Sequence, residues 1–267
     1  PENSDVQMLL INGIEQPLPH DQPLMIPVHP GSQQVVVNWL QAHKGRQWWY
    51  ENIPVRLEQD SVNARVEIQP RQDRWLLWLS GPGWGPSVIF WPLLLVMALV
   101  SYGLGRMDWT PLKSRHWFLL LLGFSQCPII SALAVVVWLF VLEARQRMDP
   151  HSMSALKFNA MQTGIGALSL LAAWMLIDGV QSGLLGQPDM HIAGAGSNAQ
   201  HLIWYMDRSA PVLPQPVVIS LPIWCYRLAM LLWALWLSFA LLAWMQWGWR
   251  AFGHGAFWRA RAKRTKG

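Results

Sequence analysis

Four long apolar runs fill most of the chain after residue 87, and they constrain its fold more than any other feature. They cover residues 88–104, 117–142, 161–185 and 223–247. A helix needs about 20 apolar residues to cross the hydrocarbon core of a bilayer. Of the 267 residues, 52% are hydrophobic and only 13% are charged, whereas soluble domains carry about 25% charged residues. The sequence therefore predicts a membrane α-helical bundle over residues 88–249.

Residues 1–80 have a different pattern, with short segments rich in β-branched residues at 35–39 and 64–68. Gly, Pro, Asn and Asp separate these segments, which is typical of strands joined by turns. We expect a small all-β, sandwich-like soluble domain that depends on neighbouring sequence for part of its core. Because the chain begins at Pro1 without a signal-like segment, we also expect it to be the C-terminal part of a longer protein.

A segment rich in Gly and Pro joins the two regions. Residues 80–86 read "SGPGWGP", and this composition disfavours regular structure. We therefore predict a short, stiff hinge over residues 81–87. A phosphate-binding loop does not fit, because no Lys-Ser or Lys-Thr pair follows the glycines.

Basic residues predict the orientation, because Lys and Arg near membrane segments favour the cytoplasmic side. The links at 105–116 and 143–158 and the tail at 250–267 are basic, whereas the loop at 186–222 contains only Arg208. We expect a multi-pass protein of a bacterial-type inner membrane with a cytoplasmic C-terminus. A polybasic tail after a membrane helix is typical of contact with anionic lipid rather than nucleic acid. The tail residues concerned are Arg259, Arg261, Lys263, Arg264 and Lys266.

The second run is interrupted by "GFSQCPI", residues 123–129. Both ends of this run carry basic links, so a single crossing conflicts with the charge pattern. A re-entrant hairpin that turns at Gly123, Ser125, Gln126 and Pro128 removes the conflict and places the β domain in the periplasm. The alternative is one kinked, tilted helix of 26 residues, which would place the β domain in the cytoplasm.

Two ionisable residues lie within the predicted spans, where such groups are costly and often functional. Asp178 lies about two turns from the end of the third run, and Arg227 lies about one turn into the fourth. Since consecutive helices run antiparallel, we predict an ion pair between them. The pair would fix the helix register or, alternatively, form part of a relay for protons or substrate.

Two further features are candidates for a functional role: small residues in the third run and the polar loop that follows it. Gly164, Gly166, Ser169 and Ala172 would let another helix approach the third run closely. In the outer loop at 186–222, the stretch "HLIWYM" is expected to be an amphipathic interfacial segment. The titratable residues of the outer loop are Asp189, His191, His201, Asp207 and Arg208. The spacing of its two His and two Asp residues matches no metal-ligand pattern.

Motifs of the GxSxG, HExxH and GxGxxG types are absent from the sequence, so we assign no catalytic, cofactor-binding or metal-binding residue. The first functional hypothesis is an anchor or scaffold that presents the β domain outside the cytoplasm. The alternatives are a transporter or channel component, and a membrane enzyme acting on lipid-linked glycan. Expected partners are the bilayer, including anionic lipid, and proteins that contact the β domain or the small-residue helix faces.

Overall fold

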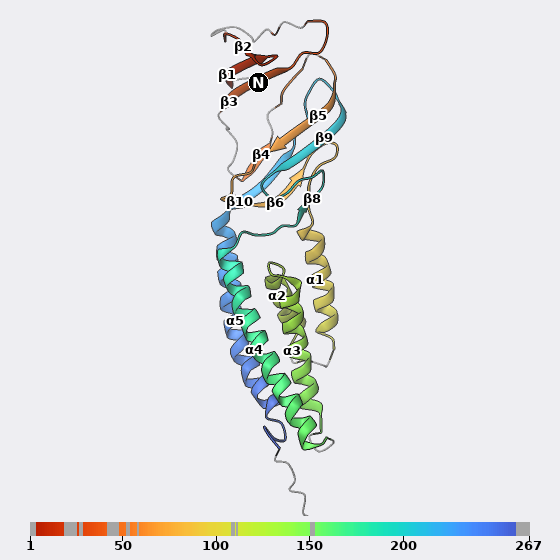
Figure 1. The fold of residues 1–267 in the computed structure, drawn as a ribbon, viewed down its shortest axis with the longest axis vertical. Helices are drawn as coiled ribbons and strands as arrows, with labels where there is room; N and C mark the ends of the chain where they lie inside the picture. The colour runs from red at the N-terminus through yellow and green to blue at the C-terminus, as the bar shows by residue number, and fades with distance from the viewer. Residues whose placement is uncertain are drawn as a thin grey trace, which may run out of the picture.

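Strands and helices occupy opposite ends of an elongated molecule (Figure 1). The computed structural model describes residues 4–18, 26, 29–41, 48–51, 54–57, 59–107, 110, 112–149 and 153–259. A strand-rich region includes the N-terminal part of the chain, and long apolar helices form the rest. The structure thus confirms a β-rich N-terminal region followed by membrane-length helices.

The β region contains four antiparallel sheets within the described residues. They are β2-β1-β3, β4-β10-β6, β5-β9 and β7-β8. The strand bounds are β1 (Ser4–Ile11), β2 (Ile14–Glu15), β3 (Val35–Gln41), β4 (Trp49–Glu51), β5 (Ser61–Ile68), β6 (Arg74–Ser80), β7 (Ser87–Val88), β8 (Ile192–Ala193), β9 (Leu202–Ser209) and β10 (Val217–Pro222).

The segment expected to be an outer loop instead completes the β region. Strand β9 pairs with β5 from Ser209 opposite Ser61 to Leu202 opposite Ile68, and β10 lies between β4 and β6. "HLIWYM" therefore belongs mainly to a strand rather than to an amphipathic interfacial segment. Leu202 and Trp204 are buried and the residues between and after them are less so, which follows the period of two of a strand. The β domain is built from two segments remote in sequence, not from residues 1–80 alone.

Within the described residues, five helices run alternately away from and back toward the β region (Figure 1). Their bounds are α1 (Phe90–Leu104), α2 (Ser114–Phe124), α3 (Ile129–Arg147), α4 (Ala155–Leu185) and α5 (Ile223–Phe252). Helices α3, α4 and α5 are long and apolar enough to cross a membrane, and α1 is a shorter apolar helix. Apolar side chains also face outward, including Leu170 and Phe239, which are 75% and 72% exposed. Such a surface suits contact with lipid.

The second apolar run forms two helices, α2 and α3, and the chain reverses between them (Figure 1). Helix α3 has 19 residues and ends at Arg147, five residues beyond the predicted apolar run. The helix continues beyond the apolar run because Glu143 and Arg147 form an i, i+4 ion pair with an N–O distance of 2.8 Å, which favours helix. Helix α5 likewise continues beyond Trp247 to Phe252.

Two hydrophobic cores meet at the junction of the β region and the helices. The larger lies among α2, α3, α4 and α5, and includes Trp117 and Leu237. The smaller includes Leu202 and Trp204 of β9 together with residues of β6 and α1. Trp75 of β6 packs against both, and its ring lies 5.5 Å from the ring of Tyr226 in α5. The strands and helices therefore share one continuous packed interior.

Candidate functional site at the junction of the β domain and the helices

The Gly-Pro segment, for which we predicted a short, stiff hinge, is packed against β9. Trp204 is 1% exposed, and a Cβ atom on either Gly81 or Gly85 would overlap its indole ring. Gly83 has a φ of +75°, a conformation that glycine adopts without strain. The backbones of Trp84 and Tyr205 exchange hydrogen bonds of 2.9 and 2.8 Å. The glycines are therefore required for close packing, and the segment fixes the β domain to the helices.

Gly123, Ser125 and Pro128 of "GFSQCPI" each have a defined role in the turn from α2 to α3. Gly123 leaves space for the ring of Trp233, whose Nε1 donates to the Leu119 carbonyl at 2.7 Å. The Ser125 hydroxyl donates to the Leu122 carbonyl at 2.7 Å, and Pro128 precedes the first residue of α3. The turn satisfies its own polar groups and packs against α5.

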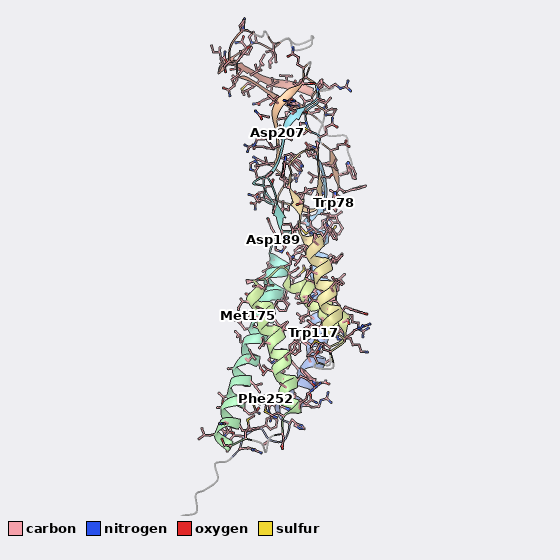
Figure 2. All side chains as sticks on the ribbon, turned by 90° about the vertical axis from the view of Figure 1, so that its right-hand side faces the viewer. Trp78, Trp117, Met175, Asp189, Asp207 and Phe252 are labelled. Carbon is pink, nitrogen blue, oxygen red and sulfur yellow. The ribbon has the colours of Figure 1, made fainter. Side chains whose placement is uncertain are left out.

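Gln126 fastens this turn to the segment that follows α4. Its Oε1 accepts a hydrogen bond of 2.8 Å from the Asp189 backbone N–H, and its Nε2 donates to the Asp189 carbonyl at 3.4 Å. Figure 2 shows Asp189 where the helices meet the strands. The tip of the α2–α3 hairpin thus contacts the segment that joins α4 to β8 of the β domain.

A cavity of about 360 Å³ lies beside this turn, and we call it the junction pocket. Its walls come from β6, α1, α2, the 125–126 turn, the segment after α4, and α5. The residues are Trp75, Leu77, Phe90, Trp91, Leu94, Phe118, Leu122, Gly123, Ser125, Gln126, Pro188, Met190, Tyr226, Ala229, Met230 and Trp233. Its volume falls within the roughly 300–1,000 Å³ typical of ligand pockets.

The polar groups of the pocket wall are largely paired with protein atoms. Trp91 Nε1 donates to the Leu77 carbonyl at 2.8 Å, and Trp75 Nε1 lies 3.2 Å from the Met190 sulfur. Trp233, Ser125 and Gln126 use their polar atoms as described above. The Tyr226 hydroxyl is buried and has no hydrogen-bond partner within the described part of the chain. The pocket therefore presents mainly hydrocarbon to whatever occupies it.

The ion pair predicted between Asp178 and Arg227 is not among the ion pairs that the described residues form. Gly183 packs against Met230, and this register offsets the two charged residues by eight positions, about 12 Å along the helix axes. Arg227 is exposed and lies on the outer surface near Leu185 and Trp224. The prediction failed because the apolar runs do not give the register between the two helices.

The small residues of α4 also differ in their surroundings from what we expected. A Cβ atom on Gly164 or Gly166 would meet nothing within 4 Å. Close approach occurs instead at Gly183, where α4 packs on Met230 of α5. Ser169 accepts a 2.9 Å hydrogen bond from Trp138 Nε1, and Ala172 is fully buried.

A buried polar cluster closes the opposite end of the bundle, and sequence reasoning missed it. Arg145 is 1% exposed. Its Nε donates to Gln162 Oε1 at 3.0 Å and its Nη2 donates to the His254 carbonyl at 2.7 Å. Gln162 Nε2 donates to the Phe252 carbonyl at 2.9 Å. These bonds satisfy carbonyl groups at the C-terminal end of α5, where a cation is also favoured by the helix dipole.

The tail residue Arg259 belongs to this cluster rather than to a lipid-facing tail. Its guanidinium lies 5.1 Å from the centre of the Phe158 ring, and its Nη1 donates to the Met153 carbonyl at 3.1 Å. Its backbone N–H donates to Asn159 Oδ1 at 3.0 Å. Residues 253–259 therefore fold back on the bundle end. Arg261, Lys263, Arg264 and Lys266 lie outside the described residues.

The titratable residues of the 186–222 segment do not converge on one site. Asp189 and Asp207 lie at different heights of the β domain (Figure 2), and His191 contacts its neighbour Asp189 at 3.2 Å. His201 Nε2 lies 2.8 Å from Glu67 Oε2, and Arg65 Nε lies 2.6 Å from Glu67 Oε1. Across the described ranges, no group of three or more His, Cys, Asp or Glu residues could hold a metal ion.

Comparisons with known proteins do not place the chain in a family. No family model, no curated protein and no solved structure matches it. The functional argument therefore depends on the geometry of this chain.

Proposed function

We propose that this chain is an integral inner-membrane anchor that holds its β domain in a fixed orientation on the periplasmic face of a bacterial membrane. The tail and the link between α3 and α4 lie on the cytoplasmic side in this arrangement. The proposal combines three membrane-length helices with a β domain joined to them by packed, non-hinged connections.

The observation that carries the proposal is the way in which the strands connect to the helices. Strand β10 ends at Pro222 and α5 begins at Ile223, so the sheet passes directly into a membrane-length helix. Trp204 of β9 packs between Gly81 and Gly85, which lie just before α1. The β domain is thereby fixed to the bundle through segments on both sides of α1–α4. A scaffold gains from such stiffness, because the domain keeps one orientation relative to the membrane.

The distribution of basic residues supports the orientation. The end of the bundle away from the β domain carries Arg145 and Arg147 at the end of α3 and Arg250 in the last turn of α5. Arg106, Lys113 and Arg115 lie about halfway along the bundle, where His116 packs beside Trp236 of α5. The 186–222 segment on the β side contains only Arg208. This asymmetry fits the preference of Lys and Arg for the cytoplasmic side.

The alternative functions receive less support from the geometry. A transporter that used the interrupted second run and Asp178 would need a polar cavity there, but the pocket that Ser125 and Gln126 line is largely apolar and Asp178 is not part of its wall. A glycan-processing enzyme needs converging titratable groups, and those of the 186–222 segment are dispersed. Protein partners of the scaffold would contact the β domain or the open face at Gly164 and Gly166.

Sidedness tests this proposal directly. Lys157 in the first turn of α4 and Val62 in β5 are both exposed and lie at opposite ends of the molecule. We expect Val62→Cys to react with a membrane-impermeant maleimide in cells whose outer membrane alone is permeabilised, and Lys157→Cys to react only after the inner membrane is opened. The unmodified chain controls for Cys127 and Cys225. The reverse pattern would place the β domain in the cytoplasm and refute the proposed orientation.

A further inference from the structure

The junction pocket is an open, apolar recess of about 360 Å³ between the β domain and the helices. A buried water molecule needs two to four polar partners, and the polar groups of this wall are mostly occupied by protein atoms. Hydrocarbon is the occupant that this wall suits.

The pocket reaches the outer surface of the helices between α1 and α5. Trp91 of α1 and Ala229 of α5 both line the pocket and are both exposed. Beside this opening, α1 exposes Leu95 and Leu99, each 63% exposed. An opening bordered by apolar surface on membrane-associated helices faces lipid.

The length of the pocket along the helices matches the thickness of one leaflet of the hydrocarbon core. Trp91 is the second residue of α1, and Trp233 is ten residues after the start of α5. At 1.5 Å per residue, the wall extends to about 15 Å below the β domain, which is half of the roughly 30 Å hydrocarbon core.

We propose that the junction pocket binds one acyl chain of a phospholipid from the leaflet next to the β domain. This inference rests on the proposed membrane location of the chain. The acyl chain would enter between Trp91 and Ala229 and lie against Phe118 and Trp233. It fills the space among α1, α2 and α5 and so contributes to the stiffness of the junction.

Photocrosslinking of the full chain in liposomes tests the proposal. The probe is phosphatidylcholine with a diazirine near the end of one acyl chain, diluted into phosphatidylethanolamine and phosphatidylglycerol. We expect crosslinks on the pocket residues Phe118 and Trp233, as well as on the outward-facing residues Leu170 and Leu242. Mass spectrometry of the digested protein identifies the labelled residues.

A substitution that fills the opening provides the matched comparison. Ala229→Trp should reduce labelling of the pocket residues by roughly fivefold or more, because the indole occupies the entrance sterically. Ala243→Trp, on the same helix at an exposed position outside the pocket wall, should leave pocket labelling unchanged. If Ala229→Trp does not fold, Leu94→Trp blocks the opposite wall.

The outcomes separate this inference from the proposed function. Labelling of Leu170 and Leu242 without labelling of Phe118 and Trp233 would overturn the lipid site and leave the membrane anchor intact. Absence of labelling at all four residues would overturn the membrane location as well. Pocket labelling that survives both blocking substitutions would also refute a chain bound inside the pocket.

Discussion

At the end of the bundle next to the β domain, aromatic rings pack against glycines, whereas at the opposite end buried polar side chains bind the C-terminal segment. Trp204 lies against Gly81 and Gly85, and Trp233 lies against Gly123. Arg145 and Gln162 instead donate hydrogen bonds to the carbonyls of His254 and Phe252. The first arrangement joins segments remote in sequence through shape, and the second completes the end of one helix through hydrogen bonds.

Because of this difference, the loss of a side chain should destabilise the two ends in different ways. Loss of a ring from a packed interior leaves a cavity, and the cost grows with the volume that cannot collapse. Loss of a buried donor leaves acceptors without partners, and the cost is set by their desolvation. Damage at the β-domain end should therefore spread through the sheets and the junction, while damage at the other end should stay local to residues 253–259.

The largest effect is expected from Trp204→Ala. Removal of this buried ring should destabilise the junction by about 3–5 kcal/mol. Hydrogen exchange of the full chain in detergent should show loss of protection in β5, β9 and the 80–86 segment. Trp84→Ala is the matched control, because Trp84 is adjacent to this site but 76% exposed, and it should change stability by no more than about 0.5 kcal/mol. Equal effects of the two substitutions would contradict the packing argument.

Arg145→Met should have the next largest effect. The substitution keeps the apolar stem but removes the hydrogen bonds to Gln162 and His254, which should cost about 1.5–3 kcal/mol because one partner is charged. Hydrogen exchange should increase in residues 253–259 and leave the β domain unchanged. Arg147→Met removes the surface ion pair with Glu143, worth about 0.3–0.5 kcal/mol. Loss of protection in the β domain would show that the two ends are not independent.

Gly123→Ala tests the packing of the α2–α3 turn. The added methyl group would overlap the Trp233 ring, and such overpacking costs about 1–3 kcal/mol. The thermal unfolding midpoint should fall, and exchange should increase in α2. Gly103→Ala adds the same methyl group where nothing lies within 4 Å, and it should be neutral or stabilising by up to about 1 kcal/mol. An unchanged midpoint for Gly123→Ala would mean that the ring moves away without cost.

The sequence predicted local features of the fold well. The fourth apolar run and α5 both begin at Ile223, and the β-branched segments at 35–39 and 64–68 fall within β3 and β5. These features follow from apolar periodicity and β propensity over a few neighbouring residues. The α2–α3 turn was also visible, because Gly123 and Pro128 interrupt an apolar run.

Features that depend on remote partners were not predictable in the same way. Strand β9 pairs with β5, more than 130 residues earlier, and no local pattern identifies such a partner. The glycines at 80–86 suggested a hinge, because the sequence does not show that the Trp204 ring lies against them. Arg145 could have been found, since it continues the helical spacing of the buried residues Val135, Trp138 and Leu142. Its position near a helix end led us to interpret it only as an orientation signal.

The smallest effect is expected from substitution of Glu67, which forms an exposed polar cluster with Arg65 and His201. This cluster contrasts with the buried cluster around Arg145. The hydrogen bond with His201, aided by the charge of Arg65, lowers the pKa of Glu67. A carboxyl group whose pKa is lower in the folded state stabilises the fold above its unfolded pKa, about 4.3 for Glu. That stabilisation is lost as the pH falls through the lower folded value.

Glu67→Gln isolates this contribution, because the amide resembles the protonated carboxyl group at every pH. The wild-type chain should unfold at a slightly higher temperature than Glu67→Gln at pH 6, and the two midpoints should converge as the pH falls below about 4. Glu15→Gln removes one negative charge from an exposed position and controls for net charge. A difference between wild type and Glu67→Gln that stays constant with pH would show that the ionised carboxylate does not stabilise the β5–β9 pair. Solvent screening keeps the effect small, so a large pH-dependent difference would instead indicate that another titratable group is coupled to this cluster.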